Sequence, residues 1–214
     1  MIKTLLRTLL FALMLLPLAS PASAHPHVWV TAKSEIVYAP DGSITAIRHA
    51  WTFDDMYSAF AIQGIEQKTK GQFTREELAE LAEINVTSLK EFDFFSFAKL
   101  DDKKAEFGDP KDYHLDYKNE ALTLNFTLPL KTPVKAKSLE LEMYDPSYYV
   151  DFSFSEKDSI ALIGAPAACK STLARPQEMT VQQGQRLGES FFNQLNSSQN
   201  WGAQFANKIA VKCP

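Results

Sequence analysis

The chain has 214 residues, and 45% of them are hydrophobic, which is enough for one globular domain with a sizeable core. Acidic residues outnumber basic residues by 26 to 22, giving a formal net charge of −4, and the acidic residues are scattered along the chain. This balance argues against nucleic acid and anionic lipid as partners, because both are bound by a basic face.

The first 24 residues have the pattern of a secretory signal peptide. Lys3 and Arg7 give a positive start, residues 8–19 are apolar, and small residues lead up to a cleavage point after Ala24. The apolar run is shorter than the ~20 residues that a membrane-spanning helix needs. We therefore expect export to the periplasm, no membrane insertion after cleavage, and a single α+β domain over residues 25–214.

The first half of the mature chain predicts a hairpin followed by a helix. Residues 27–38 and 44–53 are rich in β-branched and aromatic side chains, and a Pro-Asp-Gly-Ser turn signal separates them. Residues 56–62 fit a short helix or a lid-like loop. Thr74 forms a capping box with the glutamate three residues later, and the apolar spacing that follows predicts a helix over about residues 75–92.

The second half predicts an antiparallel sheet. Its short runs of strand-forming residues are 113–117, 122–130, 139–144, 148–154 and 160–163. A connector over residues 164–177, a second helix over 180–195 and a final strand over 208–213 complete the chain. The predicted class is α+β, mostly antiparallel β-sheet with two helices packed on it.

Two cysteines, Cys169 and Cys213, lie in the C-terminal fifth of the chain. An even number of cysteines in an exported protein favours a disulfide, whereas a redox pair would need the closer C-x-x-C spacing. We expect one structural bridge that joins the last strand to the loop after Gly164.

The N-terminus of the mature chain has the residues of a metal chelate. Cleavage after Ala24 leaves His25 with a free α-amine, and the amine and imidazole can bind one ion together. His27 follows on the same face of an extended strand. Pro26 has no amide proton, which blocks the square-planar amino-terminal copper or nickel mode. The alternative is a frayed terminus without a ligand.

Strand register predicts the carboxylate that lies near His27. If the turn is a two-residue one, paired positions sum to 83, so that Trp29 faces Asp54 and Asp54 is the diagonal neighbour of His27. His49 then lies on the other face, and a single bulge would reverse that assignment. Asp54 together with Asp55 is equally consistent with a cap for the following segment.

Motifs of catalysis are absent from the sequence. It contains no G-x-S-x-G, H-E-x-x-H, C-x-x-C or glycine-rich phosphate loop. His114, in an alternating strand, is expected to face solvent. We therefore expect a protein that is not an enzyme.

Four motifs, in this order along the mature chain, resemble the bacterial domain-of-unknown-function family 1007. They are His25-Pro26-His27-Val28-Trp29-Val30, Trp51-Thr52-Phe53-Asp54-Asp55-Met56-Tyr57-Ser58, Tyr144-Asp145-Pro146-Ser147-Tyr148-Tyr149-Val150 and Ile209-Ala210-Val211-Lys212-Cys213-Pro214. The family is labelled as a periplasmic component of an ABC-type transport system, and its members often accompany permeases of the nickel/cobalt type. The resemblance implies a periplasmic accessory protein for transition-metal transport.

The resemblance also points to residues whose roles the sequence does not define. These possible functional residues are Asp55, Tyr57, Asp145, Tyr148 and Asp151.

Our leading hypothesis is capture of a divalent ion by His25, His27 and Asp54, with His49 as a conditional ligand, and its transfer to or from an inner-membrane permease. Zinc or nickel is the expected ion, and cobalt or copper is also compatible with this donor set. Two alternatives stay open. One is copper chemistry at an N-terminal His brace, in a carrier or an oxidative enzyme, and the other is a docking subunit whose segment 56–60 binds the permease without any metal.

Overall fold

The computed structural model describes residues 26–155, 157, 159–176, 191, 194 and 199–214. His25 and the signal peptide lie outside the described residues, as does nearly all of the helix predicted over 180–195. None of the helices in the described ranges has the length and apolarity that a bilayer-spanning segment needs.

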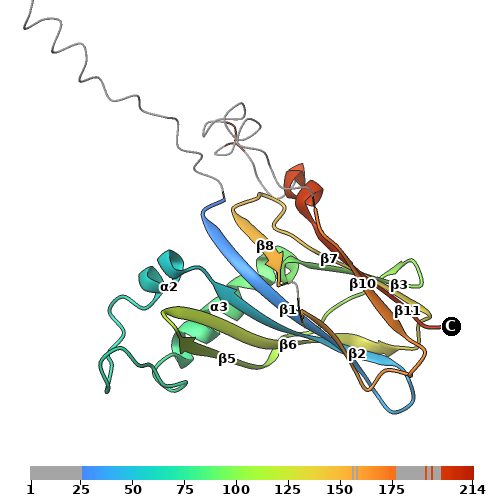
Figure 1. Ribbon diagram of the computed structural model, residues 1–214, viewed down its shortest axis with the longest axis horizontal. Coiled ribbons are helices and arrows are strands. Elements are labelled where there is room, and N and C mark those ends of the chain that lie inside the picture. Colours follow the sequence, from blue (N-terminus) through green and yellow to red (C-terminus); the bar gives the residue numbers. More distant parts are fainter. Residues whose placement is uncertain (1–25, 156, 158, 177–190, 192–193, 195–198) are drawn as a thin grey trace, which may run out of the picture.

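Two β-sheets form the body of the protein (Figure 1). The first has the order β5-β6-β2-β1-β8, with β9 also paired to β1, and the second has the order β10-β11-β7-β3-β4. The strands of the first sheet are β1 (Val28–Tyr38), β2 (Ile44–Phe53), β5 (Lys111–Lys118), β6 (Ala121–Val134), β8 (Val150–Phe154) and β9 (Ile160–Ile163). Those of the second are β3 (Ser96–Leu100), β4 (Lys103–Lys104), β7 (Ser138–Met143), β10 (Lys170–Ala174) and β11 (Asn207–Lys212).

The core lies between the two sheets. Along β1 and β2 the side chains alternate between buried and more exposed, as a sheet with one face on the core requires. Trp51 of β2 is 1% exposed, and its ring packs on Phe126 of β6 and on Phe152 of β8. It also stacks on Phe95, which directly precedes β3 and so connects the two layers.

The helices follow the first hairpin. The short α2 (Asp55–Ala61) contacts β6, and α3 (Ala79–Leu89) packs on β5. The predicted capping box is present, since Glu77 accepts the backbone N–H of Thr74 at 2.7 Å and Thr74 Oγ1 accepts that of Glu77 at 3.2 Å. α3 continues into the 3₁₀ segment η1 (Lys90–Phe95), and a second 3₁₀ segment, η3 (Trp201–Phe205), precedes β11.

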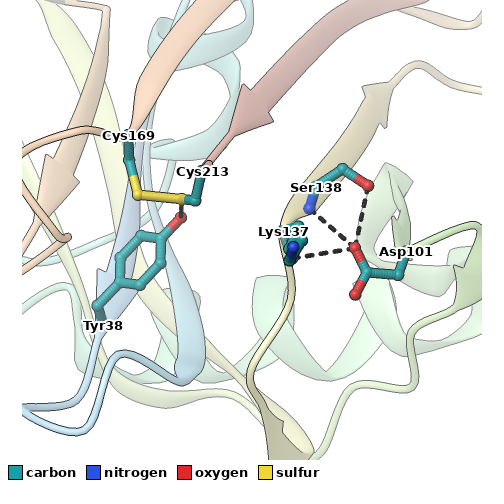
Figure 2. The surroundings of a disulfide bond; sticks show 6 residues. All are labelled: Tyr38, Asp101, Lys137, Ser138, Cys169 and Cys213. Atoms are coloured by element: carbon teal, nitrogen blue, oxygen red, sulfur yellow. Dashed lines mark hydrogen bonds between the residues drawn. A yellow bond between two sulfur atoms is a disulfide. The ribbon is translucent and has the colours of Figure 1, made fainter.

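The predicted disulfide is confirmed. Cys169 directly precedes β10 and Cys213 directly follows β11, so the bond ties the ends of two neighbouring strands (Figure 2). The Cys213 N–H donates to the carbonyl of Lys137 at 2.7 Å, and the hydroxyl of Tyr38 lies 3.9 Å from the Cys213 sulfur. Beside it, Asp101 accepts three hydrogen bonds from Lys137 and Ser138, which fixes the start of β7.

The α+β class with mostly antiparallel sheets is confirmed, but three details were not predicted. β8 and β9 pair with β1 in parallel, because the chain reaches β8 by crossing over from β7 of the second sheet. β10 lies inside the segment predicted as a connector. The alanines and prolines around it do not indicate a strand, and β10 forms by pairing with β11. β3 and β4 directly follow η1, and no strand was predicted there.

Candidate functional site at the start of β1

The register of the first hairpin agrees with the prediction from the start of β1 as far as Val37. Val30 pairs with Phe53 and Val37 with Ala46, so paired positions sum to 83 along most of the hairpin. The turn itself is longer than two residues, because the Ala39 N–H donates to the Ser43 carbonyl, and a bulge after Val37 absorbs the difference. The irregularity therefore lies at the turn end and leaves the start of β1 in the predicted register.

His27 lies on the outer face of the first sheet. Its side chain is exposed, and its ring lies 4.7 Å from that of Tyr149, which directly precedes β8. Both N–H groups of His27 and Val28 donate to the Tyr149 carbonyl, at 2.9 and 3.3 Å. Trp29 pairs with Asp151 of β8, and directly paired residues share a face of the sheet. Asp151 is thereby the diagonal neighbour of His27 on one side.

Asp54 is the diagonal neighbour of His27 on the other side, and it caps α2. Its Oδ1 accepts the N–H of Tyr57 at 2.8 Å, and its Oδ2 accepts the N–H of Trp29 at 2.9 Å. The cap that the sequence left as an alternative is thus present. Because one of these bonds reaches β1, Asp54 also fixes the end of β2 against the start of β1. Its neighbour Asp55 is exposed and accepts only a local hydrogen bond, from Met56 N.

His49 lies on the inner face, away from His27 and Asp54. It is 3% exposed, and burial lowers its pKa to about 3. Ser96 Oγ donates to the Phe94 carbonyl at 2.9 Å, so it accepts from His49 Nε2 at 3.4 Å. Ser34 Oγ then donates to Nδ1 at 3.0 Å rather than to the more distant Met143 Sδ at 3.5 Å, as a neutral imidazole with its proton on Nε2 requires. The sheet itself separates His49 from His27 and Asp54, since the register shift between β1 and β2 lies at the turn end of the hairpin.

Asp145 organises the loop that supports His27. It is 4% exposed, and its Oδ1 accepts the backbone N–H and the hydroxyl of Ser147, each at 2.8 Å. Its Oδ2 accepts the N–H groups of Tyr149 and Val150 at 3.0 Å. These four bonds hold the residues from which β8 starts. Gly202 closes the loop from outside: its N–H donates to the Pro146 carbonyl, and a Cβ there would collide with the Asp145 carbonyl.

The two tyrosines singled out by the resemblance are packing residues at different depths. Tyr148 is buried, and its ring lies 4.3 Å from Phe205 and 5.5 Å from Trp201 of η3. Tyr57 is half-buried on Phe53, with ring centroids 4.6 Å apart, and its hydroxyl donates to Asn85 Oδ1 at 3.3 Å. Burial raises the pKa of Tyr57, and the negative charge of Asp54 raises it further.

The arrangement at the start of β1 is therefore one exposed imidazole between two carboxylates of the same sheet face. In the part of the chain that the structure describes, no three His, Cys, Asp or Glu side chains come close enough together to hold a metal ion. His25, the ligand on which the predicted chelate depends, directly precedes the described residues. The fourth histidine, His114, lies on β5, and β6 and β2 separate β5 from β1. Its Nε2 is 3.3 Å from Oδ2 of Asp116.

Comparison with known proteins identifies the family. The model of the family described as "Protein of unknown function (DUF1007)" matches residues 9–213. The chain belongs to this family. A relative of this DUF1007 protein from Haemophilus influenzae, named "Uncharacterized protein", is 26% identical over 196 residues, which are 89% of this chain and 91% of the relative. A second relative, the "Uncharacterized 15.5 kDa protein in trpE 3'region" of Spirochaeta aurantia, is 28% identical over 93 residues, covering 43% of this chain and 66% of that protein.

Two features of this DUF1007 site were not predicted from the sequence. Asp151 was singled out by resemblance alone, and only the parallel pairing of β8 with β1 brings it beside Trp29. The role of Asp145 had a local signal, since an Asp two residues before a Ser is typical of an Asx turn. That signal did not reveal the additional bonds to Tyr149 and Val150.

Proposed function

We propose that this protein is a periplasmic accessory protein that binds a divalent transition metal at its mature N-terminus for an inner-membrane metal permease. The observation that supports the proposal most strongly is the exposed position of His27 on the outer face, between Asp54 and Asp151. The α-amine and imidazole of His25 and the imidazole of His27 form the ligand core. Zinc or nickel suits such a set of nitrogen ligands with a nearby carboxylate, and cobalt or copper suits it as well.

The two carboxylates beside His27 lie at different places in the sheet. Both oxygens of Asp54 already accept backbone hydrogen bonds, so Asp54 orients the strands and supplies negative charge. Asp151 projects from β8 on the same face, next to Trp29. Because Asp54 is engaged in this way, we assign it as the residue that holds the site together, and Asp151 as the candidate carboxylate ligand on the same face. His49 is left out of the ligand set, because it faces the core.

Calorimetry on protein secreted with its native N-terminus tests the proposal. Mass spectrometry first verifies that His25 is the first residue, and Zn²⁺ or Ni²⁺ is then titrated. Replacing a directly bound ligand, as in His27→Ala or His25→Ala, should weaken binding about tenfold or more, since even outer-shell changes cost that much. Affinity should also fall as the pH is lowered, because neutral imidazole is the binding form.

Two controls define the site. His114→Ala removes an imidazole from β5 and should leave the affinity unchanged. A single extra residue before His25 converts the α-amine to an amide and should weaken binding as strongly as His25→Ala. Tight binding that survives both His25→Ala and His27→Ala would reject the site.

An electron paramagnetic resonance spectrum of the Cu²⁺-loaded protein, with an assay for peroxide-dependent turnover, distinguishes copper chemistry from carriage of zinc or nickel.

A second candidate function is docking to the permease without a metal. Met56 and Phe60, both on α2, are 66% and 70% exposed, and α2 starts at the cap formed by Asp54. Exposed apolar side chains next to one another are typical of a contact with a partner protein. Copurification with the permease that persists in chelator and in His27→Ala, but is lost in Phe60→Ser, would favour this function.

A further inference from the structure

A cavity of about 410 Å³ opens beside the candidate metal site and belongs to neither proposed function. It lies between the inner face of the first sheet and the helical segment formed by α3 and η1, and the loop held by Asp145 closes one side. This volume falls within the ~300 to 1,000 Å³ typical of pockets for small molecules. The cavity is therefore large enough for a compact ligand with one ring.

The walls of this cavity are mainly aromatic. Seven of its sixteen lining residues are Phe, Tyr or Trp, and most of the others are aliphatic. Trp51 and Phe152 are at the inner end of the lining, being almost fully buried, whereas Phe92 is 42% exposed and so belongs to the mouth. Aromatic faces attract cations through the ring quadrupole, and the attraction grows when the cation is desolvated.

The charges around the cavity are of one sign. Asp145 is the only charged residue among the described residues that line it, and it accepts hydrogen bonds from neutral donors only. The charge of Asp54 also reaches Tyr57, another lining residue, since it contributes to the raised pKa of that phenol. Lys90, next in sequence to the lining residue Leu89, is paired with Asp109 at 2.8 Å. An anionic ligand would thus meet uncompensated negative charge.

From this lining and this charge we infer that the cavity binds a small hydrophobic organic cation, such as an aryl or alkyl ammonium compound. The apolar body lies against Trp51 and Phe152, and the cationic group lies among the aromatic rings near the mouth. Binding needs no metal and no N-terminal histidine, so it is independent of the function proposed above.

Three probes of nearly the same shape test the inference by ligand-observed NMR and calorimetry in the presence of EDTA. They are phenyltrimethylammonium, its neutral isostere tert-butylbenzene, and benzenesulfonate. The cation should bind saturably and about fivefold more tightly than the neutral isostere, as one cation–π contact at a partly exposed site predicts. Benzenesulfonate should not compete with it. Equal or tighter binding of tert-butylbenzene, or no saturable binding of the cation, would overturn the inference.

Two variants at exposed positions locate the site without disturbing the core. Ser88→Trp fills the mouth from α3 and should abolish binding of the cation, with an unchanged far-UV circular dichroism spectrum and thermal midpoint. Phe92→Leu keeps an apolar side chain but removes one ring. This variant should lower the affinity for the cation about two- to fivefold and leave the affinity for tert-butylbenzene unchanged. Unchanged cation binding in Ser88→Trp would show that the probe binds elsewhere, and would reject this cavity as the site.

Discussion

His27 and His49 lie on the same pair of strands and have opposite environments. His27 is exposed on the outer face against Tyr149, whereas His49 is 3% exposed between two serines on the inner face. The difference follows from the two-residue period of a strand, because residues an odd number of positions apart point to opposite faces. His49 pairs with Ser34, which is seven positions from His27 along the same strand direction. An imidazole in solvent is able to exchange ligands and protons. An imidazole in the core is held neutral and serves packing.

The two faces also depend on different supports. The inner face is held by apolar packing around Trp51, whose ring contacts Phe126 and Phe152 of the same sheet and Phe95 of η1. The outer face at the start of β1 is held by backbone hydrogen bonds to two aspartates, Asp54 and Asp145. Carboxylates with several N–H donors thus do at the edge of the sheet what hydrophobic burial does in its centre.

The largest effect is expected from removing the support of the outer face. Asp145→Ala removes a buried carboxylate that accepts three backbone N–H groups of a partly buried loop, and should lower the free energy of unfolding by about 3 to 5 kcal/mol. Urea denaturation measures this loss. Asp55→Ala, at an exposed aspartate, is the matched control and should change stability by less than about 0.5 kcal/mol. A small effect of Asp145→Ala would mean that the loop is held by η3 instead.

The pH dependence of stability tests the environment of His49 on the inner face. The pKa of His49 is about 3 in the folded protein and about 6.5 when exposed, so only the unfolded state takes up a proton between these values. The stability contributed by keeping this ring neutral is complete above pH 6.5 and is lost as the pH falls. As the pH is lowered from 7 to 5, His49 alone should lower the free energy of unfolding by about 2 kcal/mol.

The His49→Gln variant should lack this component of the pH dependence, although it is less stable than the wild type at pH 7. Comparing urea denaturation of the two proteins at pH 7 and pH 5 checks the difference. If the slopes of wild type and His49→Gln agree, His49 is protonated in the folded protein.

The smallest effect concerns Asp54, and it separates a cap from a ligand. Asp54→Ser keeps an N-cap oxygen for Tyr57 but loses the acceptor of Trp29 N–H, so stability should fall by about 1 kcal/mol. Metal affinity, measured by calorimetry, should fall less than in Asp151→Asn. The opposite order would make Asp54 the carboxylate ligand and Asp151 the supporting residue.

The sequence alone determined the local elements and the register of the first hairpin. Residues 44–53 form a strand as predicted, and so do residues 160–163, because alternation and turn signals are properties of neighbouring residues. The pairing of Trp29 with the Asp54 position and the placement of His49 on the other face followed from the same alternation. The disulfide was predictable because the chain contains only two cysteines.

The tertiary structure decided what depends on segments that are far apart in sequence. Parallel pairing brings Asp151 beside Trp29 across more than half the chain, and no local pattern encodes that partner. The aromatic cavity likewise joins β1, β2, α3 and the Asp145 loop, each of which has its own local reason for its apolar residues. Periodicity states which face of an element is buried. Only the packing of the two sheets determines what that face meets, and where the packing leaves a space.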